Sequence, residues 1–296
     1  MHTLAPGDAG YPALLAPVPN APTLDVRGTL LDDDALAIAI VGSRRPTPYG
    51  VEVAERLAAD LAARGVTVVS GLARGIDTAA HRGALDAGGR TLAVLGHGID
   101  LCYPPENRPL AERIEAAGAL VSQFVMGTSP QARNFPARNR TIAGLALGVV
   151  VVEAAERSGA LITAGAAGDL GREVYAVPGR VTAETSRGPH GLLRDGATLV
   201  RSWMDVVQEI PSPWRSAVRD APVLADAAAV AVTADELTVL AALPIDEARH
   251  IEHVIHECGL SSARVGASLV SLELSGRARQ LEGQRWIAIG ARTRRA

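Results

Sequence analysis

Two arginines and a serine directly follow a short aliphatic run near residue 40. The run 37–41 leads into Gly42, Ser43, Arg44 and Arg45, and a helical pattern comes next. A hydroxyl and two guanidiniums after a strand can hold a phosphate, because backbone amides and helix N-termini face outward there. The turn lacks the second and third glycines of the G-x-G-x-x-G dinucleotide fingerprint. The pattern therefore favours phosphate capture over its alternative, an ordinary strand-to-helix turn with solvated arginines.

A second turn of this kind follows the next aliphatic run. Gly71 and Gly75 enclose Arg74, and Asp77 comes just before a helix predicted over 78–85. Asp is a preferred N-cap residue, and capping alone accounts for Asp77 without a catalytic role. Arg74 has two candidate partners, a ligand and Asp77.

The segment 129–140 combines arginines, side-chain amides and one of only two phenylalanines. Phe135 precedes Arg138, Asn139 and Arg140 in what its prolines indicate is a loop. An aromatic ring among guanidiniums suits single-stranded nucleic acid, since a base stacks on the ring while arginines contact phosphates. Two interpretations stay open: Phe135 stacks on a base, or it fills the core and the arginines are solvated.

A fourth motif follows a later aliphatic run. Ser158 and Gly159 are predicted to begin a helix and to offer free N–H groups to an anion. Glu153, where the preceding strand ends, is expected to orient an arginine of the segment 129–140. The histidines 250, 253 and 256 do not form H-E-x-x-H, so no metal is predicted. No nucleophile elbow is present, and we expect no catalytic residue and no cofactor.

The composition excludes several classes of enzyme. All 29 basic residues are arginines, so a Walker-type phosphate loop and Schiff-base chemistry are both excluded for want of a lysine. The formal net charge is only −3, so an anion site depends on local clustering. Cys102 and Cys258 cannot build a disulfide framework. No apolar run reaches the roughly 18 residues that span a bilayer, and no secretory signal begins the chain. We expect a reduced, cytoplasmic protein without membrane contact.

The elements that must position these motifs alternate along the chain. Aliphatic runs at 37–41, 66–69, 91–95, 148–152 and 173–177 lack polar alternation, which is typical of strands buried on both faces. Amphipathic segments such as 51–64 lie between them. This pattern predicts an α/β fold with an extended Rossmann-like parallel sheet over 36–210.

The flanking regions divide into three further parts. Residues 1–35 are expected to be a short segment packed on the Rossmann-like domain, and 211–232, rich in Pro and Ala, to be a linker. Helical patterns at 234–243, 246–257 and 262–274, followed by a hairpin pattern, predict a small winged helix-turn-helix domain over 233–296. Residues 217–296 hold nine arginines against ten acidic residues, so protein contact or weak duplex-DNA contact is expected of it.

Together the motifs resemble the DNA processing protein A (DprA/Smf) family. The matching segments are GSR at 42–44 with YG at 49–50, SGLARGIDTAAH at 70–81, LGHGID at 95–100 with YPPEN at 103–107, FPARNR at 135–140 with IAGL at 142–145, and SGALITA at 158–164. They occur in family order, so the resemblance is specific where each single motif is not.

The resemblance implies a non-enzymatic mediator that binds single-stranded DNA, protects it during natural transformation and helps load RecA. It implies a homodimer, with His190, Leu193 and Leu199 in the segment where the family dimerises. Many relatives begin with a helical SAM-like domain, and this chain departs from them, because residues 1–35 are too few to form it and we expect it to be missing. The family's usual lysines in the DNA site are absent here, so arginines replace them or affinity is lower. The residues that it assigns to the DNA pocket are Gly42, Ser43, Arg44, Phe135, Arg138, Asn139, Ser158 and Gly159, to which the motifs themselves add Arg45, Arg74 and Arg140.

Two other functions are alternatives to single-stranded DNA binding. A nucleoside-monophosphate phosphoribohydrolase has a related fold but needs a P-G-G-x-G-T-x-x-E stretch, and the nearest segment, 164–169, lacks the Thr and the Glu. A protein-interaction scaffold would instead use the winged helix as its working part.

Overall fold

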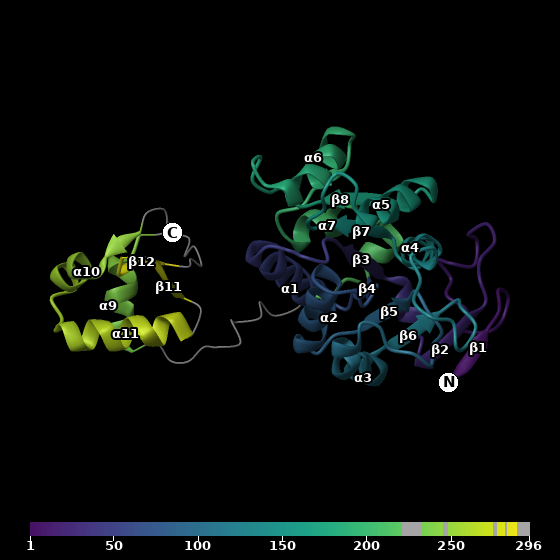
Figure 1. Cartoon of the computed structure of the whole chain (residues 1–296), viewed down its shortest axis with the longest axis horizontal. Helices are drawn as coiled ribbons and strands as arrows, with labels where there is room; N and C mark the ends of the chain where they lie inside the picture. The colour runs from purple at the N-terminus through teal and green to yellow at the C-terminus, as the bar shows by residue number, and fades with distance from the viewer. Residues whose placement is uncertain (221–232, 245–247, 275–276, 282, 289–296) are drawn as a thin grey trace. The chain divides into compact units, whose positions relative to one another are not determined.

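The computed structural model describes residues 1–220, 233–244, 248–274, 277–281 and 283–288 (Figure 1). The chain forms two compact units, Met1–Ala221 and Pro222–Ala296. No helix in the described ranges is both long and apolar enough to cross a membrane.

The larger unit is built on a nine-stranded sheet in the order β1-β2-β6-β5-β4-β3-β7-β8-β9. β2 pairs antiparallel with β1 and with β6, and every other neighbouring pair is parallel. The Rossmann-like sheet is confirmed, with an antiparallel extension at one edge that the sequence did not predict. The strands are β1 (His2–Leu4), β2 (Leu24–Gly28), β3 (Ala37–Val41), β4 (Thr67–Ser70), β5 (Thr91–Leu95), β6 (Ala119–Ser122), β7 (Gly148–Val151), β8 (Glu173–Ala176) and β9 (Thr198–Leu199).

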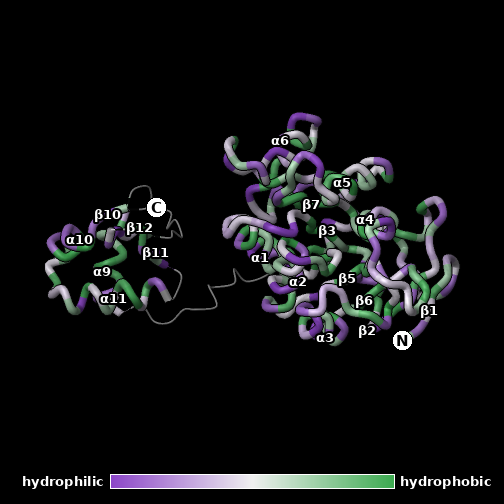
Figure 2. Tube along the Cα trace, viewed as in Figure 1, coloured by the Kyte–Doolittle hydropathy of each residue, from purple (hydrophilic) through white to green (hydrophobic). Residues whose placement is uncertain are grey.

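Helices cover both faces of this sheet (Figure 1). Residues of β3 alternate between the faces: Ala37, Ala39 and Val41 belong to the cluster that includes residues of α4 and α5, whereas Ile38 and Ile40 pack with α1 and α2. Both clusters are made of buried residues. In the larger unit the trace is hydrophobic along the central strands (Figure 2). The helices are α1 (Pro48–Ala63), α2 (Ile76–Asp86), α3 (Arg108–Ala117), α4 (Asn134–Gly144), α5 (Gly159–Asp169), α6 (Arg187–Arg194), α7 (Trp203–Glu209) and α8 (Ser212–Arg215), with short 3-10 turns at Asp32–Ala35, Pro105–Asn107 and Glu184–Ser186.

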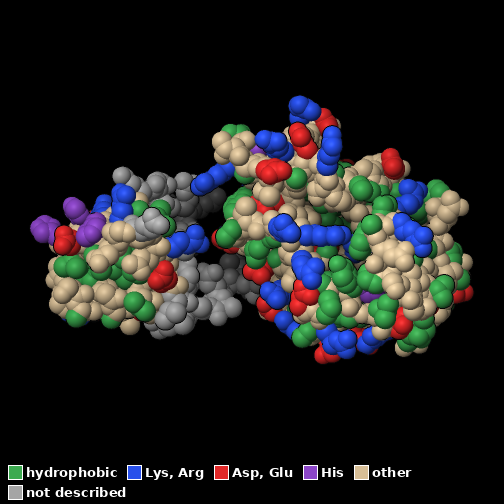
Figure 3. All heavy atoms as spheres, in the orientation of Figure 1, with side chains coloured by type: hydrophobic (Ala, Val, Ile, Leu, Met, Phe, Trp, Pro, Cys, Tyr) green, Lys and Arg blue, Asp and Glu red, His purple; other side chains and the backbone are tan. Residues whose placement is uncertain are grey.

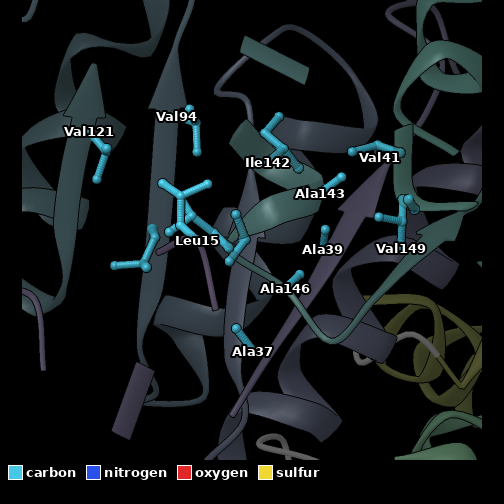
Figure 4. Packing of buried hydrophobic residues seen from close by; sticks show 14 of the residues in the cluster. Leu15, Ala37, Ala39, Val41, Val94, Val121, Ile142, Ala143, Ala146 and Val149 are labelled. Atoms are coloured by element: carbon cyan, nitrogen blue, oxygen red, sulfur yellow. The ribbon is translucent and has the colours of Figure 1, made fainter. Parts of the chain in front are cut away.

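Both ends of the first unit pack on the Rossmann-like core. Residues 1–35 supply β1 and β2, and Leu15 enters the cluster beneath α4, beside Ile142 and Ala146 (Figure 4). The segment 211–220, expected to begin a linker, forms α8 and packs Trp214 against the cluster on the opposite face. The described part of that segment therefore belongs with the first unit, and 221–232 lie outside the described residues.

The smaller unit confirms the winged helix. Helices α9 (Ala234–Ala242), α10 (Ile251–Cys258) and α11 (Ser262–Leu274) pack with a sheet ordered β10-β12-β11. Its strands are β10 (Arg249–His250), β11 (Ala278–Leu281) and β12 (Arg285–Ala288). Val254, Leu269 and Trp286 lie in its core. The second helix begins at 251, later than predicted, because His250 caps it by accepting a hydrogen bond from the Glu252 amide. Positions 245–247, 275–276, 282 and 289–296 of the expected domain lie outside the described residues.

Candidate nucleic-acid interface

The sheet order creates a crevice where ligands bind in this class of fold. From β3 the chain runs through α1 to β4 on one side, and from β7 through α5 to β8 on the other side. Ligands of open α/β sheets bind beyond the carboxyl ends of the strands, at such a switch point. Loops after β3, β4 and β5 meet the first turn of α4 at this edge and form a shallow pocket. The pocket is lined by Arg44, Gly71, Ala73, Arg74, Gly96, His97, Tyr103, Pro104, Phe135 and Arg138.

Phe135 is the centre of this pocket. It lies in the first turn of α4, so the loop expected here is wrong: Pro136 is tolerated because first-turn amides need no helical partner. The partly buried ring packs on Gly96, where an added Cβ would lie 2.8 Å from a ring carbon. The Arg44 guanidinium carbon lies 4.8 Å from the ring centroid, and that of Arg138 lies 5.5 Å from it. Guanidiniums from two distant segments thus converge on one ring.

These two arginines have different environments. Arg44 is exposed and forms no ion pair with any residue that the structure describes. Arg138 is 4% exposed and donates hydrogen bonds from one nitrogen to the carbonyls of Gly71 (2.5 Å) and Val94 (2.8 Å). Its burial lowers the pKa of the guanidinium, and neighbouring Asp77 opposes that shift. Arg44 is placed to contact a ligand, whereas Arg138 holds the loops that frame the pocket.

Asp77 does not cap α2, contrary to expectation. The cap position is Gly75, and Asp77 lies inside the first turn. Its carboxylate accepts hydrogen bonds from the backbone amides of Gly71 (3.1 Å) and Ala73 (3.4 Å). Burial raises the pKa of this carboxyl, and Arg138 and the two amides act against that shift. Asp77 therefore stabilises the 71–75 loop through the amides of that loop. Within this loop Leu72 has a positive φ of 56°.

The turn after β3 is held by a hydrogen bond within the turn and by contacts with the start of α2. The Ser43 hydroxyl accepts a hydrogen bond from the Arg45 amide (3.1 Å), and the Ser43 carbonyl accepts one from the Ile76 amide (3.1 Å). Gly42 is required, since an added Cβ would lie 2.6 Å from the Ile76 side chain. Arg45 is exposed but does not line the Phe135 pocket.

The third and fourth motifs lie together. Ser158 caps α5, as predicted, by accepting a hydrogen bond from the Ala160 amide. The Asn139 amide group donates to the Gly159 carbonyl (3.1 Å), which ties α4 to the start of α5. Glu153 orients no arginine: it accepts hydrogen bonds from the amide (2.8 Å) and hydroxyl (2.6 Å) of Thr47. It fixes the start of α1 instead, which corrects the expectation from sequence.

Two further predicted arginines differ in their relation to the Phe135 pocket. Arg140 lines a separate groove with Leu15 and Gln123, between α4 and the N-terminal segment. Arg74 lines the pocket and forms an ion pair with Glu106, so of its two candidate partners the ligand stays open and Asp77 is replaced by Glu106.

Sequence reasoning did not assign Tyr103 or Glu106 to the site. Tyr103 lines the pocket, with its ring centroid 6.0 Å from the Arg74 guanidinium carbon. The available signal was an aromatic residue in a loop after a buried strand, in a chain with 3% aromatic residues.

The three residues assigned to dimerisation lie at the β9 end of the sheet. His190 and Leu193 are in α6, and the His190 Nε2 atom lies 3.1 Å from the Gly179 carbonyl oxygen. Leu199 is 43% exposed on β9, which among the described strands pairs with β8 alone. Over the described ranges, no cluster of His, Cys, Asp and Glu is arranged to hold a metal ion.

Comparison with known proteins gives the family of the chain. The model of the DNA recombination-mediator protein A family matches residues 2–211. The chain belongs to this family. Its winged helix domain model matches residues 223–284 as well. The DprA/Smf relative from Escherichia coli, Protein Smf, is 40% identical over 284 residues, which cover 93% of this chain and 74% of that protein.

Two solved DprA structures are similar to this fold. DNA processing protein A of Streptococcus pneumoniae gives a TM-score of 0.67 at 42% identity, covering 71% of this chain and 74% of that chain. DNA processing protein A of Helicobacter pylori gives a TM-score of 0.61 at 28% sequence identity, covering 70% of this chain and 94% of that chain. The latter structure was described for its single-stranded DNA binding mode.

Proposed function

We propose that this protein is a single-stranded DNA-binding recombination mediator. In this role it protects incoming DNA and helps load RecA during natural transformation, without making or breaking a covalent bond. The convergence of Arg44 and Arg138 on Phe135, at the carboxyl edge of the sheet, is the observation that carries the proposal. Family membership and the described DNA binding of the Helicobacter pylori relative support it.

The residues divide the work of binding. Arg44, with Arg45 beside it, contacts phosphates, while the exposed Gly159 at the start of α5 offers its backbone N–H to another phosphate. The N–H of the neighbouring Ser158 is already bonded to the Ala155 carbonyl. The Phe135 ring supplies an apolar surface for a base, and base–aromatic stacking contributes about 1–3 kcal/mol per base. Single strands fit this pocket better than duplexes because their bases are free to stack.

A hydrolase is the less well supported alternative. Residues 164–169, the segment nearest to the required P-G-G-x-G-T-x-x-E stretch, form the second half of α5. They therefore offer no loop at the pocket in which a catalytic carboxylate would stand.

The proposed homodimer uses the β9 edge, where Leu199 is exposed. Two copies of an edge strand can pair through their free backbone groups, or their flanking helices can pack. The winged helix is proposed to contact protein, or duplex DNA weakly. Arg264 on α11 and Arg249 beside α10 are each engaged by a carboxylate, of Asp235 and Glu257 respectively.

Fluorescence anisotropy with labelled oligonucleotides tests the proposal. We expect oligo-dT to bind more tightly than a duplex of equal length, and the affinity to fall steeply with salt, because phosphate neutralisation releases counterions. Equal affinity for both forms, or release of free base from nucleoside monophosphates, would reject it.

A further inference from the structure

A second arginine–aromatic pair lies at the edge of the Phe135 pocket. The Arg74 guanidinium carbon is 6.0 Å from the centroid of the Tyr103 ring. Tyr103 is 38% exposed and the Arg74 side chain 53% exposed, so both are open to a ligand. The chemistry of the first pair, a ring beside a guanidinium, is thus repeated on the neighbouring loops.

Arg74 differs from Arg44 in being already occupied by a carboxylate. Its Nε donates a hydrogen bond to the Glu106 carboxylate, and both side chains are about half exposed. This hydrogen bond raises the pKa of Arg74 and lowers that of Glu106, so both groups stay charged. A carboxylate presents two oxygens to a guanidinium much as a phosphate does. Glu106 therefore occupies the position that a DNA phosphate would take.

The two loops that carry this ion pair are fixed to each other. The Asn107 side-chain amide, 5% exposed, donates hydrogen bonds to the Leu72 carbonyl (2.9 Å) and to the Thr78 hydroxyl (2.9 Å). These acceptors stand on either side of Arg74 in the chain. The backbone thus keeps Arg74 and Glu106 close to each other in any rotamer of their long side chains.

We infer that Arg74 and Tyr103 form a second nucleotide-binding position. The Glu106 carboxylate stays paired with the Arg74 guanidinium until the phosphate of a single-stranded nucleotide displaces that carboxylate. A single strand gains stacking on Tyr103 as its phosphate replaces the carboxylate. A duplex gains no such stacking, since its bases are already paired, and its phosphate alone must compete with Glu106. Glu106 therefore acts as a specificity residue against duplex DNA, an inference that rests on the proposed single-strand binding.

The test compares oligo-dT and duplex binding of the full chain by anisotropy at low and at moderate salt. Glu106→Gln keeps the shape and removes the charge, so we expect duplex affinity to rise by about 3–10-fold at about 50 mM salt and less at about 200 mM, where screening is stronger. Tyr103→Ala should weaken oligo-dT binding at least about fivefold and change duplex binding little. Tyr103→Phe, which keeps the ring, should bind as the wild type does.

Asp86→Asn is the matched control. Asp86 forms an exposed ion pair with Arg113 at the far end of α2, about 15 Å along the helix from the pocket. Asp86→Asn removes one negative charge, as Glu106→Gln does, and should leave the affinities for oligo-dT and for the duplex unchanged. The inference is overturned if Glu106→Gln behaves like Asp86→Asn, or if Tyr103→Ala retains full oligo-dT binding, in a protein that still prefers single strands. A wild type without that preference overturns the proposed function itself.

Discussion

Arg44 combines exposure, a ring contact and the absence of a carboxylate partner among the residues described. It can therefore meet a phosphate without first breaking an ion pair. We expect Arg44→Ala to weaken oligo-dT binding at least about fivefold and to make the salt dependence shallower by about 0.7 in logarithmic slope, since one phosphate contact is lost. Anisotropy over a salt series measures both quantities. Arg113→Ala, far from the pocket, serves as the control, and equal effects of the two variants would contradict the assignment.

Arg138 shares the ring with Arg44 but should respond differently to substitution. Truncation leaves the Asp77 carboxylate buried without its cation and removes hydrogen bonds to Gly71 and Val94. Breaking a buried charge pair in this way costs about 3–5 kcal/mol. We expect Arg138→Ala to lower the free energy of unfolding by that amount in urea titrations, whereas Arg44→Ala leaves it nearly unchanged. A stable Arg138→Ala variant would show that the side chain does not hold these loops.

His81 makes stability depend on pH. It is fully buried, its Nδ1 hydrogen bonds to the Thr91 hydroxyl (2.7 Å), and its Nε2 has no hydrogen-bond partner among the residues that the structure describes. Burial, with a smaller effect of Arg138, lowers its pKa from 6.5 to about 3. Between these values only the unfolded chain binds the proton, so stability is lost as the pH falls from about 6.5 towards 3.

The expected size follows from the same linkage. Between pH 7 and pH 5 the free energy of unfolding should fall by about 2 kcal/mol through this group alone. Urea titrations of the wild type and of His81→Gln at both pH values measure it. The variant should show a correspondingly smaller loss, and an identical pH dependence would mean that His81 is not the responsible group.

At the scale of elements, the closeness of α1 and α2 sets where the 71–77 loop stands. A Cβ at Gly83 would lie 2.1 Å from the Glu55 carbonyl oxygen, which is backbone and cannot move aside. Gly83→Ala should therefore destabilise the fold by about 1–3 kcal/mol. Gly165→Ala on the exposed side of α5 meets no atom within 4 Å and should stabilise by about 0.5–1 kcal/mol. Thermal unfolding measures both, and a stable Gly83→Ala would show that the helices can separate without cost.

The elements also show how far sequence reasoning reaches. Strands β3, β4, β5, β7 and β8 were predicted because burial on both faces leaves an uninterrupted aliphatic run. β2 was missed because Asp25 and Arg27 interrupt its apolar residues at the antiparallel edge, and β9 because it has two residues. The prolines around Phe135 favour a loop over a helix, but a first helical turn accepts Pro136, and α4 begins there.

The candidate site could be predicted only in part, because it depends on contacts between segments that are far apart in the sequence. Residue types and strand ends indicated Arg44 and Phe135 separately. Their contact depends on α4 reaching the carboxyl edge some ninety positions later in the chain. The ion pair of Arg74 with Glu106 depends on the hydrogen bonds by which Asn107 joins two loops. No local sequence pattern predicts such hydrogen bonds between distant segments.

At the scale of the whole molecule, charge is distributed without a dominant sign. The net charge is −3, and arginine and acidic side chains are intermixed over the visible face of the larger unit (Figure 3). Long-range attraction of DNA is therefore weak, and affinity must come from the pocket at short range. The proposed function therefore predicts that the first unit binds DNA, since it contains every residue of the Phe135 pocket.

A shortened chain tests that placement. Residues 1–221 form a compact unit with its own core, so they should fold without the winged helix. We expect this fragment to bind oligo-dT within about twofold of the full chain and with the same salt slope, because no phosphate contact has been removed. Circular dichroism checks that it is folded, and anisotropy measures the binding. A folded fragment that binds about tenfold more weakly would require phosphate contacts from the winged helix, whose described arginines include the exposed Arg279 and Arg285 besides the ion-paired Arg249 and Arg264.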